Sequence, residues 1–181
     1  HMAFLEAHDF VTQDGALTPD GVWASKLRID APLLVAQGIR KNLLPQQDPA
    51  LLAAIVSAFV NEKEFSDDLL YTGSLPKRLK DVFLENRKGL KPFALQLLES
   101  GFDAPNLFIQ PCALLYAWAH DAPWEEMING SDFAEGDLAR LILRTSENLR
   151  QIASLEDSFP QIAMTARRAI DLIVKEPVVM V

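Results

Sequence analysis

Two arginines four residues apart are the side chains of this sequence best suited to bind an anion or a base. Arg140 and Arg144 lie in the segment 135–152, where apolar residues recur at helical spacing. At 100° per residue, both guanidinium groups fall on the face opposite the apolar stripe, together with Glu147 and Gln151. Such a pair can bracket successive phosphates or stack on bases. The alternative is a solvated face on which Glu147 pairs with Arg144 at i,i+3.

The helix that carries these arginines is one of about seven or eight predicted along the chain. Its inward stripe is predicted to consist of Leu138, Leu141, Ile142, Thr145, Leu149 and Ile152. The other predicted helices span residues 19–28, 32–41, 50–62, 76–100, 110–118, 123–128 and 160–175. Gly89 and Pro92 are expected to break or kink the helix 76–100, and the polar residues 63–74 to form a loop. Because no alternating strand pattern occurs, the sequence predicts an all-α bundle.

No constellation of catalytic residues accompanies these helices. The sequence contains no G-x-x-x-x-G-K-[ST] phosphate loop, no G-x-S-x-G turn and no H-E-x-x-H pair. His8 and His120 lie far apart in the sequence, and we interpret both as surface residues. The single cysteine, Cys112, lies in an apolar run, which predicts a buried thiol and a reducing, cytoplasmic setting. No apolar run approaches ~20 residues, so no contact with a membrane is expected.

The charge of the chain gives little information about its partners. The net charge is −8, whereas proteins that coat nucleic acid use clustered lysine and arginine. Residues 76–91 are locally basic and residues 121–137 are locally acidic. We interpret both stretches as solvated helix faces.

The segment around the two arginines resembles a family signature. The run Glu135-Gly136-Asp137-Leu138-Ala139-Arg140, then Arg144, then Asn148-Leu149-Arg150-Gln151-Ile152 resembles E-G-D-hydrophobic-x-R…R…L-R-Q-I. That signature belongs to the DSHCT domain, the C-terminal helical region of superkiller-type DExH-box RNA helicases. Further upstream, residues 17–25 resemble the family's T-x-x-G-x-x-A segment, 52–60 its L-A-A-hydrophobic-x-S-x-F-V helix, and 116–124 its tryptophan-containing segment. The resemblance covers about residues 11–181.

The resemblance implies a role for individual residues. In the family, two motor domains hydrolyse ATP and pull single-stranded RNA through a channel that the helical bundle closes. By motif position, Arg140 and Arg144 match the arginines that face the strand, and Glu62 matches a glutamate close to the bases. Gly136 would permit a tight start of the signature helix. ATP and Mg²⁺ would be held by the missing motor domains, so this chain is expected to be non-catalytic and to hold no cofactor.

The resemblance also defines the expected organisation and partners. We expect residues 1–2 to be a tag remnant, 3–18 an N-terminal lead-in and 19–181 the helical domain. The expected partners are single-stranded RNA, with DNA left open, and the helicase motor domains of the same chain. Two positions depart from the family pattern: Asp121 stands where a glycine often follows the tryptophan, and Leu143 where a second basic residue is common.

A scaffold is the alternative function. It would clamp the motor domains or dock an RNA-degradation partner, and it requires no contact with a strand. An exposed apolar patch that includes Trp23 or Trp124, in place of a basic groove, would favour it.

Overall fold

A computed structural model describes residues 1–65 and 75–180 of the chain. These residues contain nine α-helices and no β-strand, which confirms the all-α prediction with one or two more helices than expected. The elements are α1 Met2–Ala7, α2 Pro19–Ala24, α3 Pro32–Arg40, α4 Pro49–Val60, α5 Lys77–Glu99, α6 Ile109–Ala119, α7 Trp124–Asn129, α8 Glu135–Ala153, α9 Pro160–Ile173 and the 3₁₀ helix η2 Val178–Met180. No helix in the described ranges is long and apolar enough to cross a membrane. The predicted loop 63–74 lies outside these ranges from residue 66 onward.

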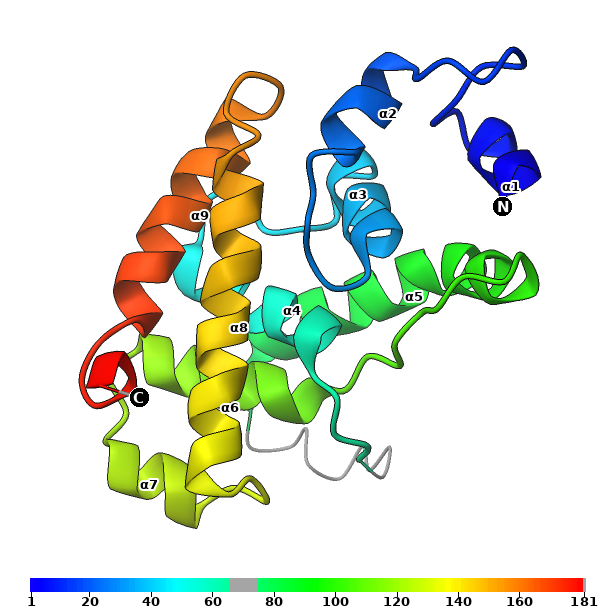
Figure 1. Cartoon of the computed structure of the whole chain (residues 1–181). Helices are drawn as coiled ribbons and strands as arrows, with labels where there is room; N and C mark the ends of the chain where they lie inside the picture. Colours follow the sequence, from blue (N-terminus) through cyan, green and yellow to red (C-terminus); the bar gives the residue numbers. More distant parts are fainter. Residues whose placement is uncertain (66–74, 181) are drawn as a thin grey trace.

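The helix α4 lies at the centre of the fold and contacts α6, α8 and α9 (Figure 1). It begins with Pro49 at its first position, and the Asp48 side chain accepts a hydrogen bond from the Leu51 N–H at 3.1 Å. Every residue from 50 to 60 is buried, as expected of a helix that is apolar on all sides. Cys112 of α6 is also fully buried, as predicted, and burial raises the pKa of its thiol to about 12.

The helix α5 continues without interruption through Gly89 and Pro92, so of the two predicted alternatives, a break or a kink, the break is wrong. Pro92 is exposed, and the buried Leu90 and Phe93 on either side of it hold this turn against the core. The helix loses one backbone hydrogen bond at the proline, but the packing of its apolar face outweighs that loss. Gly89 instead makes room for Leu43, whose side chain would lie 3.0 Å from a β-carbon at that position.

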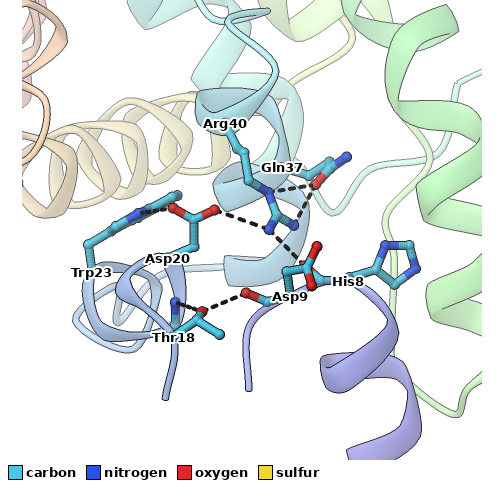
Figure 2. Close-up of polar contacts among 8 residues, drawn as sticks. His8, Asp9, Thr18, Asp20, Trp23, Gln37 and Arg40 are labelled. Atoms are coloured by element: carbon cyan, nitrogen blue, oxygen red, sulfur yellow. Dashed lines mark hydrogen bonds and ion pairs between the residues drawn. The ribbon is translucent and has the colours of Figure 1, made fainter. Parts of the chain in front are cut away.

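The first 18 residues pack on the bundle through Arg40 of α3 (Figure 2). Its Nη1 donates to the carbonyl oxygen of His8 at 2.7 Å and to Asp20 Oδ2 at 3.3 Å. Its Nη2 donates to Gln37 Oε1 at 2.9 Å, and the guanidinium carbon lies 4.1 Å from the centre of the Phe10 ring. Arg40 therefore connects the lead-in, α2 and α3 in one polar cluster.

The helix α1 begins at Met2, one of the two residues expected to be a tag remnant. His8 follows this helix and packs edge-on against Phe93 of α5, with ring centres 4.9 Å apart. It is half-buried, so His8 is less exposed than a typical surface residue. His120 is exposed, as predicted.

The helix α2 is shorter than predicted, because it ends at Ala24 and not near Arg28. The hydroxyl of Ser25 donates back to the carbonyl oxygen of Val22 at 2.8 Å, which helps to close the last turn. Leu27 is buried beyond that turn. The chain therefore leaves the helix early and runs as an irregular segment to Pro32, where α3 begins.

The T-x-x-G-x-x-A pattern has a structural reason in α2. Thr18 Oγ1 caps the helix by accepting from the Gly21 N–H at 3.0 Å, and it donates to the carbonyl oxygen of Asp9 at 2.5 Å (Figure 2). Gly21 lies directly against the carbonyl of Phe10, which a β-carbon would overlap. The same carbonyl accepts from the Thr18 N–H at 3.1 Å. Glycine is required because the lead-in crosses α2 at this point.

We predict that Gly21→Ala separates the lead-in from α2. The added methyl group meets backbone and not a flexible side chain, so the Thr18–Phe10 hydrogen bond must break or stretch. The expected loss of unfolding free energy is about 1–3 kcal/mol, which is typical of overpacking. Urea denaturation measures this loss, and hydrogen exchange locates it in residues 1–20.

Gly136→Ala serves as the matched control. A β-carbon on Gly136 meets no atom within 4 Å, so the described residues do not show the tight helix start expected there. Alanine in the first turn of α8 should leave stability unchanged or raise it by up to about 1 kcal/mol. Equal destabilisation by the two substitutions would contradict the crossing of the lead-in over Gly21.

Candidate nucleic-acid interface

The helix α8 carries its two arginines on the face that points away from the core. It packs beside α9 and against α4 (Figure 1). Glu135 and Asp137 in its first turn and Arg150 in its last turn complement the helix dipole. Every residue of the predicted inward stripe is buried: Leu138, Leu141, Ile142, Thr145, Leu149 and Ile152. The prediction of the inward face is confirmed, and Arg140 and Arg144 lie on the outer side.

Two carboxylates from distant parts of the chain hold the Arg144 guanidinium. Nη2 donates to Asp30 Oδ1 at 2.5 Å, and Nη1 lies 2.8 Å from Glu62 Oε1. Partial burial by itself lowers the pKa of Arg144, but the hydrogen bonds and charges of Glu62 and Asp30 outweigh it and raise the pKa. The side chains of Arg144, Asp30 and Glu62 are 30%, 38% and 74% exposed, respectively. Because all three reach solvent, each ion pair contributes about 1 kcal/mol or less to stability. The pairs fix where the guanidinium points more than they stabilise the fold.

The other charged residues of the outer face pair along the helix. Arg140 Nη2 donates to Asp137 Oδ1 at 2.7 Å, and both side chains are more than half exposed. Arg150 Nη1 donates to Glu147 Oε1 at 2.9 Å. The predicted pairing of Arg144 with Glu147 is wrong, because Asp30 and Glu62 engage both terminal nitrogens of Arg144.

A turn after α4 places Glu62 beside α8. The helix ends at Val60, two residues before the predicted boundary, so Glu62 lies outside it. The Asn61 side chain closes the turn: its Oδ1 accepts from the Lys63 N–H at 3.2 Å, and its Nδ2 donates to the Lys63 carbonyl oxygen at 2.8 Å. The same turn brings Lys63 to the interface, where its Nζ donates to the carbonyl oxygen of Asp132 at 2.5 Å.

One open cavity of about 300 Å³ contains all three residues predicted for the site. Residues 60–63 and Phe133 form one side, and Asp137, Arg140, Leu141 and Arg144 of α8 form the other. The sequence does not predict two further residues of the site: Lys63, which is expected to lie in a loop, and Asp30. No local signal identifies Asp30 as a partner of Arg144, because the two residues are 114 positions apart.

The charges at and beside this cavity balance. Its lining has two acidic residues, Glu62 and Asp137, and three basic ones, Lys63, Arg140 and Arg144. Asp30 does not line the cavity, but it pairs with Arg144 and brings the set to three charges of each sign. Such a surface does not attract phosphates by net charge, but it offers hydrogen-bond donors and acceptors side by side. That combination matches the edges of nucleobases.

In the described part of the chain, no group of three or more His, Cys, Asp or Glu residues is arranged to hold a metal ion.

Comparison with known proteins identifies the family of this chain. Residues 14–181 match the family described as the DSHCT (NUC185) domain, and the chain belongs to this family, as predicted. It is 29% identical over 165 residues to the DExH-box ATP-dependent RNA helicase DExH15 chloroplastic of Arabidopsis thaliana. It is 27% identical over 154 residues to the ATP-dependent RNA helicase mtr4 of Schizosaccharomyces pombe. These matches cover 88% and 79% of this chain but only 14% and 13% of the relatives.

Asp121, one of the two departures from the family pattern, occupies a position that favours glycine. Its φ is 66°, in the left-handed region, directly after the last turn of α6. The Asp121 N–H donates to the Trp118 carbonyl oxygen at 3.0 Å, and the Ala122 N–H to Ala117 at 3.0 Å, which is the pattern of a Schellman cap. The Asp121 carboxylate pairs with Lys175 Nζ at 2.6 Å. Asp121 therefore caps a helix and does not line the cavity of Glu62, Arg140 and Arg144.

We predict that Asp121→Gly changes stability with opposite signs at neutral and acidic pH. The hydrogen bond and charge of Lys175 lower the pKa of Asp121, so its contribution is present above the ordinary carboxyl pKa near 3.9 and is lost as pH falls below it. Glycine removes the ion pair but also removes the left-handed strain. The variant should be slightly less stable than wild type at pH 7 and at least as stable near pH 3. Thermal denaturation of both proteins between pH 3 and pH 7 tests this change of sign. A stability difference between variant and wild type that does not depend on pH would contradict the prediction.

Proposed function

We propose that this chain is a non-catalytic helical domain that lines the path of single-stranded nucleic acid in an ATP-dependent DExH-box RNA helicase. Arg140 and Arg144 would contact the strand from α8, and Glu62 would contribute hydrogen bonds to the bases. Because the relatives are RNA helicases, RNA is the favoured strand, and the affinity for DNA of the same sequence has to be measured beside it.

The convergence of three residues on one open cavity carries this proposal. Glu62 comes from the turn after α4, whereas Arg140 and Arg144 come from α8, and only the tertiary fold joins them. Since the carboxylates at the cavity already balance the arginines, the strand would be held by its base edges more than by its phosphates. Short-range contacts of this kind suit a channel wall, because they do not retain one strand position by strong charge attraction.

ATP hydrolysis is assigned to the rest of the parent protein. The relatives are named as ATP-dependent helicases, and this chain matches about one-seventh of their length. ATP and Mg²⁺ would be bound by motor domains in the remainder, and those motor domains would be the principal intramolecular partners of this bundle.

The position of the tryptophans gives no support to the alternative scaffold role. Trp23 is 5% exposed, its Nε1 donates to Asp20 Oδ1 at 2.9 Å, and its ring packs edge-on against Phe159. Trp124 is partly buried, and its Nε1 donates to Glu135 Oε1 at 2.9 Å. Neither ring therefore forms the exposed apolar patch that a docking surface would need.

We predict that Arg140→Gln/Arg144→Gln weakens binding of single-stranded RNA about tenfold or more. Each lost side-chain contact to a base reduces the binding free energy by about 1–3 kcal/mol. Glutamine retains part of this free energy because it still forms hydrogen bonds. Fluorescence anisotropy with a labelled oligonucleotide at low salt measures the change, and the same strand as DNA tests for contacts to the 2′-hydroxyl.

The matched control is Arg167→Gln/Arg168→Gln. It removes the same two charges from the exposed side of α9, where no described cavity lies, and should leave binding nearly unchanged. Equal loss in both double variants would indicate bulk charge attraction. Undetectable binding by the wild type would favour the scaffold role, for which the exposed Leu95 and Leu98 of α5 would be the first surface to test.

A further inference from the structure

A second polar cavity lies on the other side of Arg144. It has a volume of about 350 Å³ and is lined by Arg28, Ile29, Asp30, Arg144, Glu147 and Asn148. One wall is therefore the segment between α2 and α3, and the other is the next turn of α8. Because Arg144 lines both cavities, the two sites are neighbours along the outer face of α8.

The segment between α2 and α3 is fixed on both sides of Arg28. Leu27 is buried before it, and Asp30 is bound after it to Arg144 at 2.5 Å, with a longer contact to Asn148 Nδ2 at 3.4 Å. Ala31 takes a left-handed conformation with φ of 48° immediately before α3. Among residues 27–31, Arg28 alone is exposed, and it lines the cavity between these two fixed points of the segment.

Arg28 differs from the arginines of α8 in its lack of a partner. Arg140, Arg144 and Arg150 each form an ion pair with a carboxylate. In the described ranges of the chain, no hydrogen bond or ion pair engages Arg28. The two carboxylates that line the same cavity are engaged by other arginines, Asp30 by Arg144 and Glu147 by Arg150, so Arg28 is left available to a phosphate.

Asn148 provides a second, independent sign of an incomplete site. It is only 3% exposed, and its Nδ2 donates to the Arg144 carbonyl oxygen at 2.8 Å. Its Oδ1 is buried and has no hydrogen-bond partner among the described residues. A buried amide oxygen without a partner is uncommon and calls for an explanation. A ligand that draws Asp30 and Asn148 into new hydrogen bonds would supply one.

The spacing along α8 suits a single strand. Arg140, Arg144 and Asn148 are four residues apart, so each step rises about 6 Å along the helix axis. Stacked nucleotides advance by about 3.4 Å along one strand. A strand that lies along α8 would therefore reach the second cavity one or two nucleotides beyond the first.

We propose that Arg28 binds a backbone phosphate of the strand and that the segment 25–31 forms a second nucleotide subsite with Asn148. This inference rests on the proposed nucleic-acid function and extends its path beyond Arg144. The first cavity would read base edges with balanced charge, whereas Arg28 would supply a phosphate contact that depends on salt.

A titration followed by NMR separates this inference from the proposed function. The 181-residue chain, labelled with ¹⁵N, is mixed with a single-stranded RNA hexamer at low salt. We expect shifts in the Nε–Hε signals of Arg140, Arg144 and Arg28 and in the side-chain amide of Asn148. Shifts at Arg140 and Arg144 without shifts at Arg28 and Asn148 would overturn the second subsite only. The absence of shifts at all of these residues would overturn the proposed function as well.

The salt dependence of binding tests the role of the Arg28 charge. Arg28→Gln should reduce the slope of log K against log salt by about 0.7, the value for one phosphate contact on a single strand, whereas Arg28→Lys should retain the slope. Arg168→Gln is the matched control, since Arg168 is exposed on α9 and likewise has no ion-pair partner among the described residues. An unchanged slope in Arg28→Gln, or an equal change in Arg168→Gln, would contradict the proposal.

Discussion

Residues 50 to 60 of α4 have no polar face to present to water, so this helix has to be enclosed on every side. The helices α6, α8 and α9 enclose it. This constraint turns the apolar stripe of α8 inward and therefore its arginines outward. It also fixes where the chain emerges from α4. The turn at Asn61 then delivers Glu62 to within 2.8 Å of Arg144, so the interface is a direct consequence of how the core is packed.

The balance of charge at the interface reconciles an acidic chain with a role beside nucleic acid. A net charge of −8 opposes binding through bulk attraction. At the first cavity, however, carboxylates of the domain itself engage the two α8 arginines, and the local charge is close to zero. Base edges meet donors and acceptors there without strong attraction of phosphates. In the proposed role, the motor domains would supply most of the phosphate contacts, and this domain would shape the path.

Family patterns acquire physical reasons in this fold. In the T-x-x-G-x-x-A segment, the threonine caps α2, and the glycine, Gly21, lets the lead-in cross this helix. The family's glycine after the tryptophan corresponds to a position with left-handed backbone conformation at the end of α6. Asp121 adopts this conformation here and pairs with Lys175. These positions hold the bundle together, whereas Arg140, Arg144 and Glu62 lie at its surface.

The sequence by itself determined the helices from α2 to α9 and the inward face of α8, because local periodicity and capping residues carry that information. It also indicated the family and the two arginines. Only the tertiary structure decided that α5 runs through Pro92, since packing on both sides of the proline outweighs one lost hydrogen bond. It alone decided that Asp30 and Glu62 are the partners of Arg144. Contacts between residues 114 positions apart depend on how whole helices pack, and no local spacing encodes them.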